Sequence, residues 1–139
     1  METTGLAFAE PCVPIRCDAD IVVARQRVRA LAIDLGFLAT DATMLATAVS
    51  ELARNILLYA VRGEVAFDAI RRGGRDGIQV IARDAGPGIR NVPRALEAGF
   101  STSGGLGLGL PGVRRLADDF EIASNGHGTV VTIRKWVRS

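Results

Sequence analysis

The alternation of apolar and polar positions divides the chain into segments with the periods of helices and strands. A short apolar segment at Cys12–Cys17 predicts an edge strand. After it, apolar side chains recur at intervals of three and four residues, which predicts a helix that is capped by Asp18 or Asp20 and ends near Leu35. Gly36 suits the C-cap of this helix, because glycine readily adopts the left-handed conformation that ends many helices.

A second helical period follows, with Thr40 or Asp41 as the expected cap and an end near residue 60. This segment is the most apolar of the chain and has about the length of a membrane span. Glu51, Arg54 and Asn55 nevertheless fall at its centre, and placing these side chains in lipid is costly. We therefore expect a buried helix and no membrane association.

The second half of the chain has the period of strands. Two strand-like runs, at 64–71 and 77–83, are separated by the glycine and aspartate residues of a hairpin turn. The elements expected after them are a short helix at 91–99, a helix from Pro111 to about Asp118, and two strands at 120–124 and 129–136. This order predicts one α+β domain over residues 1–139, a two-layer α/β sandwich with a mixed, mostly antiparallel sheet and helices on one face.

Composition excludes several classes of function. The formal charge is +2, the arginines are scattered and aromatic residues make up 5%, so we expect no nucleic-acid-binding surface. Cys12, Cys17 and the lone His127 are too few for a disulfide framework or a four-ligand zinc site. The first residues lack the basic and apolar regions of a signal peptide, so we expect a cytoplasmic protein.

Polar side chains form one stripe along the second predicted helix. The stripe consists of Thr47, Glu51, Arg54 and Asn55, which recur at helical spacing. Such a stripe is often no more than the solvated side of a helix. However, a carboxylate and an amide oxygen one turn apart can bind Mg²⁺ or a water, which makes Glu51 and Asn55 candidate site residues.

The segment DAGPG, Asp84–Gly88, directly follows the second strand-like run. This combination is typical of an ordinary turn at the end of a strand. A carboxylate there can also accept a hydrogen bond from the exocyclic amino group of a base, and the glycines allow a flat ring to approach the backbone. Both interpretations stay open for this segment on its own.

The segment FSTSGGLGLGLPG, residues 100–112, holds five of the 16 glycines of the chain. It lacks the lysine of a P-loop, and it lacks the preceding strand and the acidic residue about 20 positions on that a dinucleotide fold requires. A flexible linker is also disfavoured, because leucines alternate with the glycines. Backbone N–H groups of such a loop, with the positive end of the helix that follows, can bind a polyphosphate.

Four motifs in this order resemble the nucleotide-binding boxes of the ATPase superfamily that contains gyrase, Hsp90, histidine kinases and MutL. The motifs are ELARN (51–55), DAGPGI (84–89), GGLGLGLPG (104–112) and GHGT (126–129), the last of which alone predicts only a hairpin turn. The closer resemblance, in SELARNILLYA and GFSTSGGLGLGLPGVRRLADDFEI, is to the anti-sigma-factor type serine/threonine kinases and their RsbT-like switch-kinase branch. Arg54 favours that branch, because the anti-sigma kinases proper often have threonine before the asparagine.

The resemblance implies a Bergerat-type ATP-binding fold with ATP and Mg²⁺ as cofactors. By the same resemblance, Glu51 is the general base, Asn55 a ligand of Mg²⁺ and Asp84 the acceptor for the adenine amino group. The other implied nucleotide-binding residues are Gly86 and Gly88 at the ring, Gly104, Gly105, Leu106, Gly107, Leu108 and Gly109 at the phosphates, and Thr129 at the adenine end.

The resemblance also implies partners. The expected substrate is a serine or threonine of a STAS-domain antagonist or scaffold protein in a bacterial partner-switching (stressosome-type) pathway. Once released, a switch kinase also binds and activates a PP2C-type phosphatase. The alternative is an anti-sigma factor that binds a sigma factor directly under the control of ATP.

Overall fold

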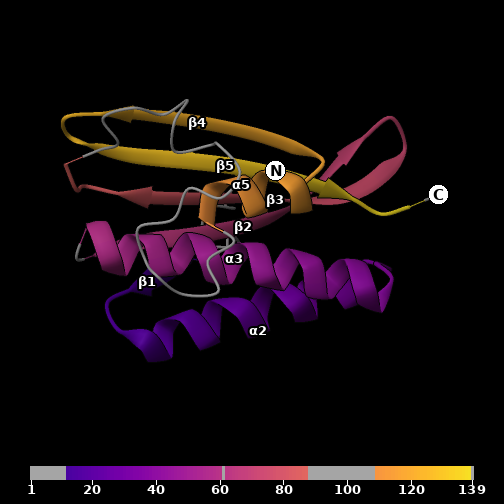
Figure 1. The fold of residues 1–139 in the computed structure, drawn as a ribbon. Coiled ribbons are helices and arrows are strands. Elements are labelled where there is room, and N and C mark those ends of the chain that lie inside the picture. The colour runs from indigo at the N-terminus through magenta and orange to yellow at the C-terminus, as the bar shows by residue number, and fades with distance from the viewer. Residues whose placement is uncertain (1–11, 61, 88–108, 139) are drawn as a thin grey trace, which may run out of the picture.

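A computed structural model describes residues 12–60, 62–87 and 109–138 of the chain. Its elements are β1 (Cys12–Ile15), α2 (Asp18–Asp34), α3 (Ala39–Tyr59), β2 (Gly63–Arg72), β3 (Arg75–Asp84), α5 (Gly109–Leu116), β4 (Asp119–Asn125) and β5 (Gly128–Trp136). The described strands form one sheet in the order β1-β2-β3-β5-β4, and every neighbouring pair is antiparallel. The helices cover one face of this sheet (Figure 1), which confirms the expected α+β two-layer fold.

Helix α2 spans the expected residues, but the predicted N-cap was wrong. Cys17 is the N-cap, and Asp20 lies in the first turn, where its Oδ2 accepts hydrogen bonds from the backbone N–H groups of Arg16 (2.8 Å) and Cys17 (3.2 Å). The carboxylate thus acts on the helix end from inside the helix. At the other end Leu35 is the C-cap and Gly36 follows it with φ 97°, which agrees with the left-handed conformation expected of this glycine.

Helix α3 begins one residue before the expected caps, so the assignment of Thr40 or Asp41 as its N-cap was also wrong. The N-cap is Leu38, whose side chain makes no capping hydrogen bond. Asp41 is instead buried, and its carboxylate forms a bidentate ion pair with Arg138, at 2.7 Å to Nε and 2.9 Å to the terminal nitrogen. Asp41 thus lies in the first turn of α3, and its side chain pairs with a residue 97 positions away.

Tight turns connect the strands, as the sequence predicted. Gly73 and Gly74 join β2 to β3 with φ values of 59° and 77°, the conformation of a type I′ hairpin turn that glycine accepts readily. Gly126 and His127 join β4 to β5. The short helix predicted at 91–99 lies outside the described residues. Helix α5 begins at Gly109, so Pro111 lies in its first turn as expected.

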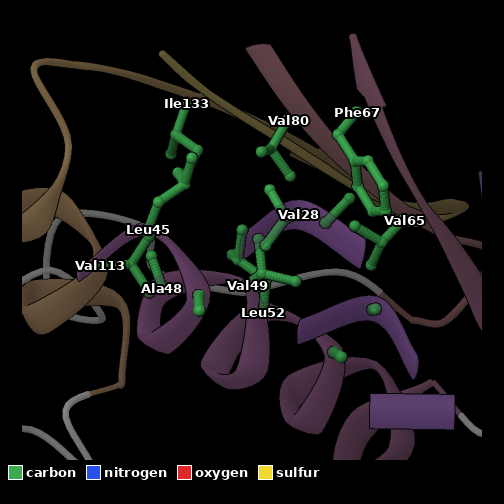
Figure 2. Close-up of a cluster of buried hydrophobic side chains, with 14 of the residues drawn as sticks. Val28, Leu45, Ala48, Val49, Leu52, Val65, Phe67, Val80, Val113 and Ile133 are labelled. Atoms are coloured by element: carbon green, nitrogen blue, oxygen red, sulfur yellow. The ribbon is translucent and has the colours of Figure 1, made fainter. Parts of the chain in front are cut away.

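The core lies between the sheet and the helices. Phe67, Val80 and Ile133 are register partners on β2, β3 and β5, and each is buried. Figure 2 shows these side chains above Leu45 and Val49 of α3. Burying one side chain of this size contributes about 1.5–3 kcal/mol, so this layer supplies much of the stability that fixes α3 against the sheet. The helix that carries the candidate site is therefore rigidly placed.

Helix α5 packs against α3 and lies on the same face of the sheet. Val113 of α5 is fully buried in the shared core (Figure 2). At the C-terminal end of α5, the buried Lys135 of β5 donates from Nζ to the carbonyl oxygen of Leu116 at 2.9 Å. A cation at this position complements the negative end of the helix dipole. In the described part of the chain, no helix is long and apolar enough to cross a membrane.

Candidate functional site

Glu51 lies on α3 at the side that faces α5. Its side chain is only 14% exposed, and its Oε2 accepts a hydrogen bond from Arg54 at 2.7 Å. Its Oε1 accepts a longer hydrogen bond, 3.4 Å, from the backbone N–H of Gly109, the first residue of α5. The fold thus brings together two predicted site residues that are 58 positions apart in sequence. The carboxylate faces the positive end of a helix dipole, a position suited to an anion.

Asn55 lies one turn beyond Glu51 and is half-buried. The hydrogen bonds among the described residues include none from its side chain, so its amide oxygen has no competing partner there. An amide oxygen one turn from a carboxylate offers the oxygen ligands that Mg²⁺ prefers. No cluster of three or more histidine, cysteine, aspartate or glutamate side chains occurs in the described residues.

Asp84 ends β3 and is fixed by two backbone N–H groups. Its Oδ1 accepts hydrogen bonds from Gly86 at 2.9 Å and from Thr129 at 3.3 Å. Thr129 is the register partner of Asp84 on β5, so the sheet itself sets the second bond. No hydrogen bond to Oδ2 is made by the described residues, which leaves that oxygen as an acceptor for a ligand. The role of Asp84 in binding stays a prediction.

Three glycines near Asp84 lie where a side chain would meet neighbouring atoms. A Cβ on Gly128 would lie 2.1 Å from the Asp84 carbonyl oxygen, and Gly128 also has φ 153°. A Cβ on Gly63 would lie 3.0 Å from the Asp84 Cβ and 2.3 Å from the carbonyl oxygen of Arg83. On the third side, a Cβ on Gly86 would lie 2.7 Å from the Cβ of Ala60, the C-cap of α3. A side chain at any of these glycines would therefore force the backbone around Asp84 or Ala60 to shift.

Thr129 is buried, and its Oγ1 lies 2.8 Å from Oγ of Ser124 on the neighbouring strand β4. The same threonine donates its backbone N–H to Asp84, so one residue links the hydroxyl pair to the carboxylate. The threonine therefore lies beside Asp84, and its role at an adenine site stays a prediction. Its hydroxyl contributes to fixing the backbone from which Asp84 receives a hydrogen bond.

Helix α3 connects the two ends of the site. It carries Glu51 at one end, and at the other its C-cap, Ala60, contacts Gly86 beside Asp84. Nine residues of helix separate the two points, a distance of about 13 Å along the axis. The remaining predicted site residues, which are Gly88, Gly104, Gly105, Leu106, Gly107 and Leu108, lie outside the described residues.

Two glycines beside Asp84 were not predicted as site residues. Gly63 was not singled out and Gly128 appeared only within the GHGT motif, because their need depends on the register of β2 and β5 against β3, which is not visible in the sequence. Arg54 was seen as part of the polar stripe, but its ion pair with Glu51 was not predicted. Its spacing of three residues from Glu51 on one helix face is a signal that could have indicated the pair.

The chain is similar to known proteins over most of its length. Residues 14–135 match the model of the histidine kinase-like ATPase domain. The chain is 48% identical to the serine/threonine-protein kinase RsbT of Bacillus subtilis (strain 168), over 93% of this chain and 98% of that protein. It is 29% identical to the anti-sigma F factor of Caldanaerobacter subterraneus subsp. tengcongensis (strain DSM 15242 / JCM 11007 / NBRC 100824 / MB4), over 82% of this chain and 83% of that protein.

Solved structures of known proteins share the fold. The crystal structure of the RsbU and RsbW domains of a Mycobacterium tuberculosis protein matches 93% of this chain and 33% of that chain, with a TM-score of 0.61 at 19% identity. The histidine kinase domain of a blue-light activated kinase from Erythrobacter litoralis matches 85% of this chain and 63% of that chain, with a TM-score of 0.54 at 20% identity. These matches confirm the fold that the four motifs predicted.

Proposed function

The chain belongs to the histidine kinase-like ATPase family as an RsbT-like serine/threonine kinase, and from this premise we propose its substrate and its site. The substrate is a serine or threonine hydroxyl on a STAS-domain antagonist or scaffold protein, and the pathway is a cytoplasmic partner-switching pathway. The observation that carries the proposal is the position of Glu51 between Arg54 and the first N–H group of α5. A carboxylate placed there can orient and deprotonate a hydroxyl beside an anion-binding helix end.

The described residues fit Mg·ATP at both ends of the site. Asp84 Oδ2 accepts from the amino group of adenine, while Oδ1 is held by the N–H of Gly86, a residue that packs closely against Ala60. Asn55 offers its amide oxygen to Mg²⁺, which, when bound, neutralises charge on the phosphates. The N-terminus of α5 supplies N–H groups and a positive dipole for the same phosphates. The residues of the chain would thus bind the nucleotide, orient the substrate hydroxyl and remove its proton.

The proposal is tested by incubating the protein with labelled Mg·ATP and each purified STAS-domain protein of the source organism. We expect one partner to gain phosphate on a serine or threonine, and Glu51→Ala to lower the rate about 100-fold or more, as for loss of a general base. Glu64→Ala is the matched control, because Glu64 of β2 also pairs with an arginine, Arg83 of β3, at 2.9 Å, and this pair makes no contact with α5 among the hydrogen bonds and ion pairs of the described residues. Absence of transfer to every partner, or equal rates for Glu51→Ala and wild type, contradicts the proposal.

We also propose that the released protein binds and activates a PP2C-type phosphatase. The support is a surface that phosphoryl transfer does not use, since Val22 and Ile33 of α2 are 40% and 43% exposed and lie on the same helix face as the exposed Arg29. Asn55→Ala separates the two roles, because it removes the candidate Mg²⁺ ligand and leaves α2 intact. We expect phosphorylation to be lost and activation of the phosphatase to persist; loss of both contradicts a separate docking role.

Direct binding of a sigma factor is the second candidate function. The 29% identity to an anti-sigma F factor supports it, whereas the 48% identity to RsbT favours the switch kinase. Capture of a purified sigma factor in the presence of ADP or ATP distinguishes the two, and we expect none.

A further inference from the structure

Arg54 and the first residue of α5 contact different oxygens of the candidate base Glu51. Its guanidinium lies 2.7 Å from Oε2 of Glu51, while Oε1 has only the 3.4 Å contact with the N–H of Gly109. The two oxygens of the carboxylate are therefore bound unequally, with a short hydrogen bond to Oε2 and a long one to Oε1. The weakly bound oxygen is the one that faces the helix end where the phosphates are expected.

The Arg54–Glu51 pair contributes little to folding. It is a pair three residues apart on one helix, and the arginine side chain is 48% exposed. Pairs of this kind contribute about 0.3–0.5 kcal/mol to stability. The glutamate side chain, in contrast, is only 14% exposed. We therefore expect the ion pair to matter mainly because it orients this carboxylate and less because it stabilises the fold.

We infer that Arg54 is a positioning residue for phosphoryl transfer, which binds Oε2 of Glu51 and so directs Oε1 toward the N-terminus of α5. This inference rests on the proposed function. In the step, Oε1 takes the proton of the substrate hydroxyl, and the hydroxyl oxygen forms a bond to the γ-phosphorus. The bond from the γ-phosphorus to the bridging oxygen breaks, and ADP leaves with the electron pair. Arg54 contacts neither reacting atom.

Kinetics of three variants test this role with Mg·ATP and the STAS-domain protein that the wild type phosphorylates. We expect Arg54→Ala to lower kcat about tenfold or more, because the base loses its orientation, with the KM for ATP changed by less than about twofold. Arg54→Lys restores most of kcat, since a lysine there can still bind one oxygen. Arg71→Ala is the control for the loss of one arginine from an ion pair, because Arg71 is 71% exposed and pairs with Asp76 far along the β2–β3 hairpin. A wild-type kcat in Arg54→Ala overturns the inference and leaves the proposed function intact.

A second measurement needs no activity. In ¹H–¹⁵N spectra of the full chain, the amide of Gly109 reports on the position of Glu51 Oε1. We expect its signal to move in Arg54→Ala, to return toward the wild-type position in Arg54→Lys and to stay in place in Arg71→Ala. An unmoved signal in Arg54→Ala overturns the inference even if no STAS-domain protein is phosphorylated, an outcome that would itself refute the proposed function.

Discussion

The two ends of the site hold their carboxylates in different ways. Asp84 accepts hydrogen bonds from two backbone N–H groups, and one of these is set by the pairing of β3 with β5. Glu51 is bound by one flexible side chain, that of Arg54, and by one long backbone contact with Gly109. The first arrangement is part of the sheet, whereas the second can change without any change in the sheet.

This difference matches what each end is proposed to do. Recognition of a planar base requires an acceptor at a fixed point, and backbone donors with glycines packed around them give that point. Transfer of a proton requires a carboxylate that is oriented but still has an oxygen free to accept the proton. A single hydrogen bond from an exposed arginine orients the carboxylate in this way. Disruption of the backbone packing around Asp84 should therefore alter both stability and binding, a change of the Asp84 carboxylate alone should alter binding, and perturbation of the Glu51 end should alter rate.

The largest expected effect is that of Gly128→Ala. The new Cβ would lie 2.1 Å from the carbonyl oxygen of Asp84, at a φ of 153°, so β5 must shift away from β3. We expect a loss of about 3 kcal/mol or more in the free energy of unfolding, together with loss of ATP binding. Gly126→Ala, two residues earlier, is the matched control, because its Cβ would meet no atom within 4 Å. Urea unfolding of both variants checks this, and equal stability would show that the Asp84 end is not rigid.

Arg138→Ala tests an arginine-bound carboxylate that is buried. The side chain of Asp41 is 2% exposed, while that of its partner Arg138 is 65% exposed. Removal of the arginine leaves a buried charge without its partner, and we expect a loss of about 2–4 kcal/mol in the free energy of unfolding. Arg71→Ala, which breaks an exposed pair, should cost less than about 1 kcal/mol. If both variants unfold at the same urea concentration, burial does not distinguish the Asp41 pair from surface pairs.

Asp84→Asn isolates the acceptor that the base is proposed to use. Asparagine keeps an oxygen for the N–H groups of Gly86 and Thr129 but replaces the other oxygen with a donor, which would face the donor of adenine. We expect ATP affinity to fall by about 1–3 kcal/mol, roughly 5- to 150-fold, with little change in the midpoint of unfolding. Calorimetric titration with ATP measures the effect. Unchanged affinity would place the adenine elsewhere.

Local patterns predicted most of the fold, and long-range contacts explain what they missed. The periods of α2, α3 and the four long strands were evident, because each depends on side chains that share one face. The N-cap of α3 was wrong because Asp41 pairs with Arg138, near the far end of the chain. Likewise, the need for glycine at position 63 depends on its register with β3. Glu51 and Asn55 could be named as candidate site residues from the sequence, because both lie in the polar stripe of one helix.

The smallest expected effect concerns Asp20, which repeats the backbone-bound arrangement of Asp84 on an exposed surface. The backbone N–H of Arg16, above all, holds the pKa of Asp20 below its ordinary value. A depressed pKa in the folded state means that ionised Asp20 stabilises the fold at neutral pH and that this stabilisation is lost as the pH falls through the folded pKa, below about pH 4. Asp20→Asn keeps an oxygen acceptor and removes the charge, so it should unfold at a slightly lower urea concentration than wild type at pH 7, and this difference should shrink as the pH is lowered toward 3. Asp34→Asn, in the last turn of the same helix, is the control, and there loss of negative charge near the negative end of the dipole should not destabilise. A difference between Asp20→Asn and wild type that is the same at both pH values would show that the carboxylate acts by shape and not by charge.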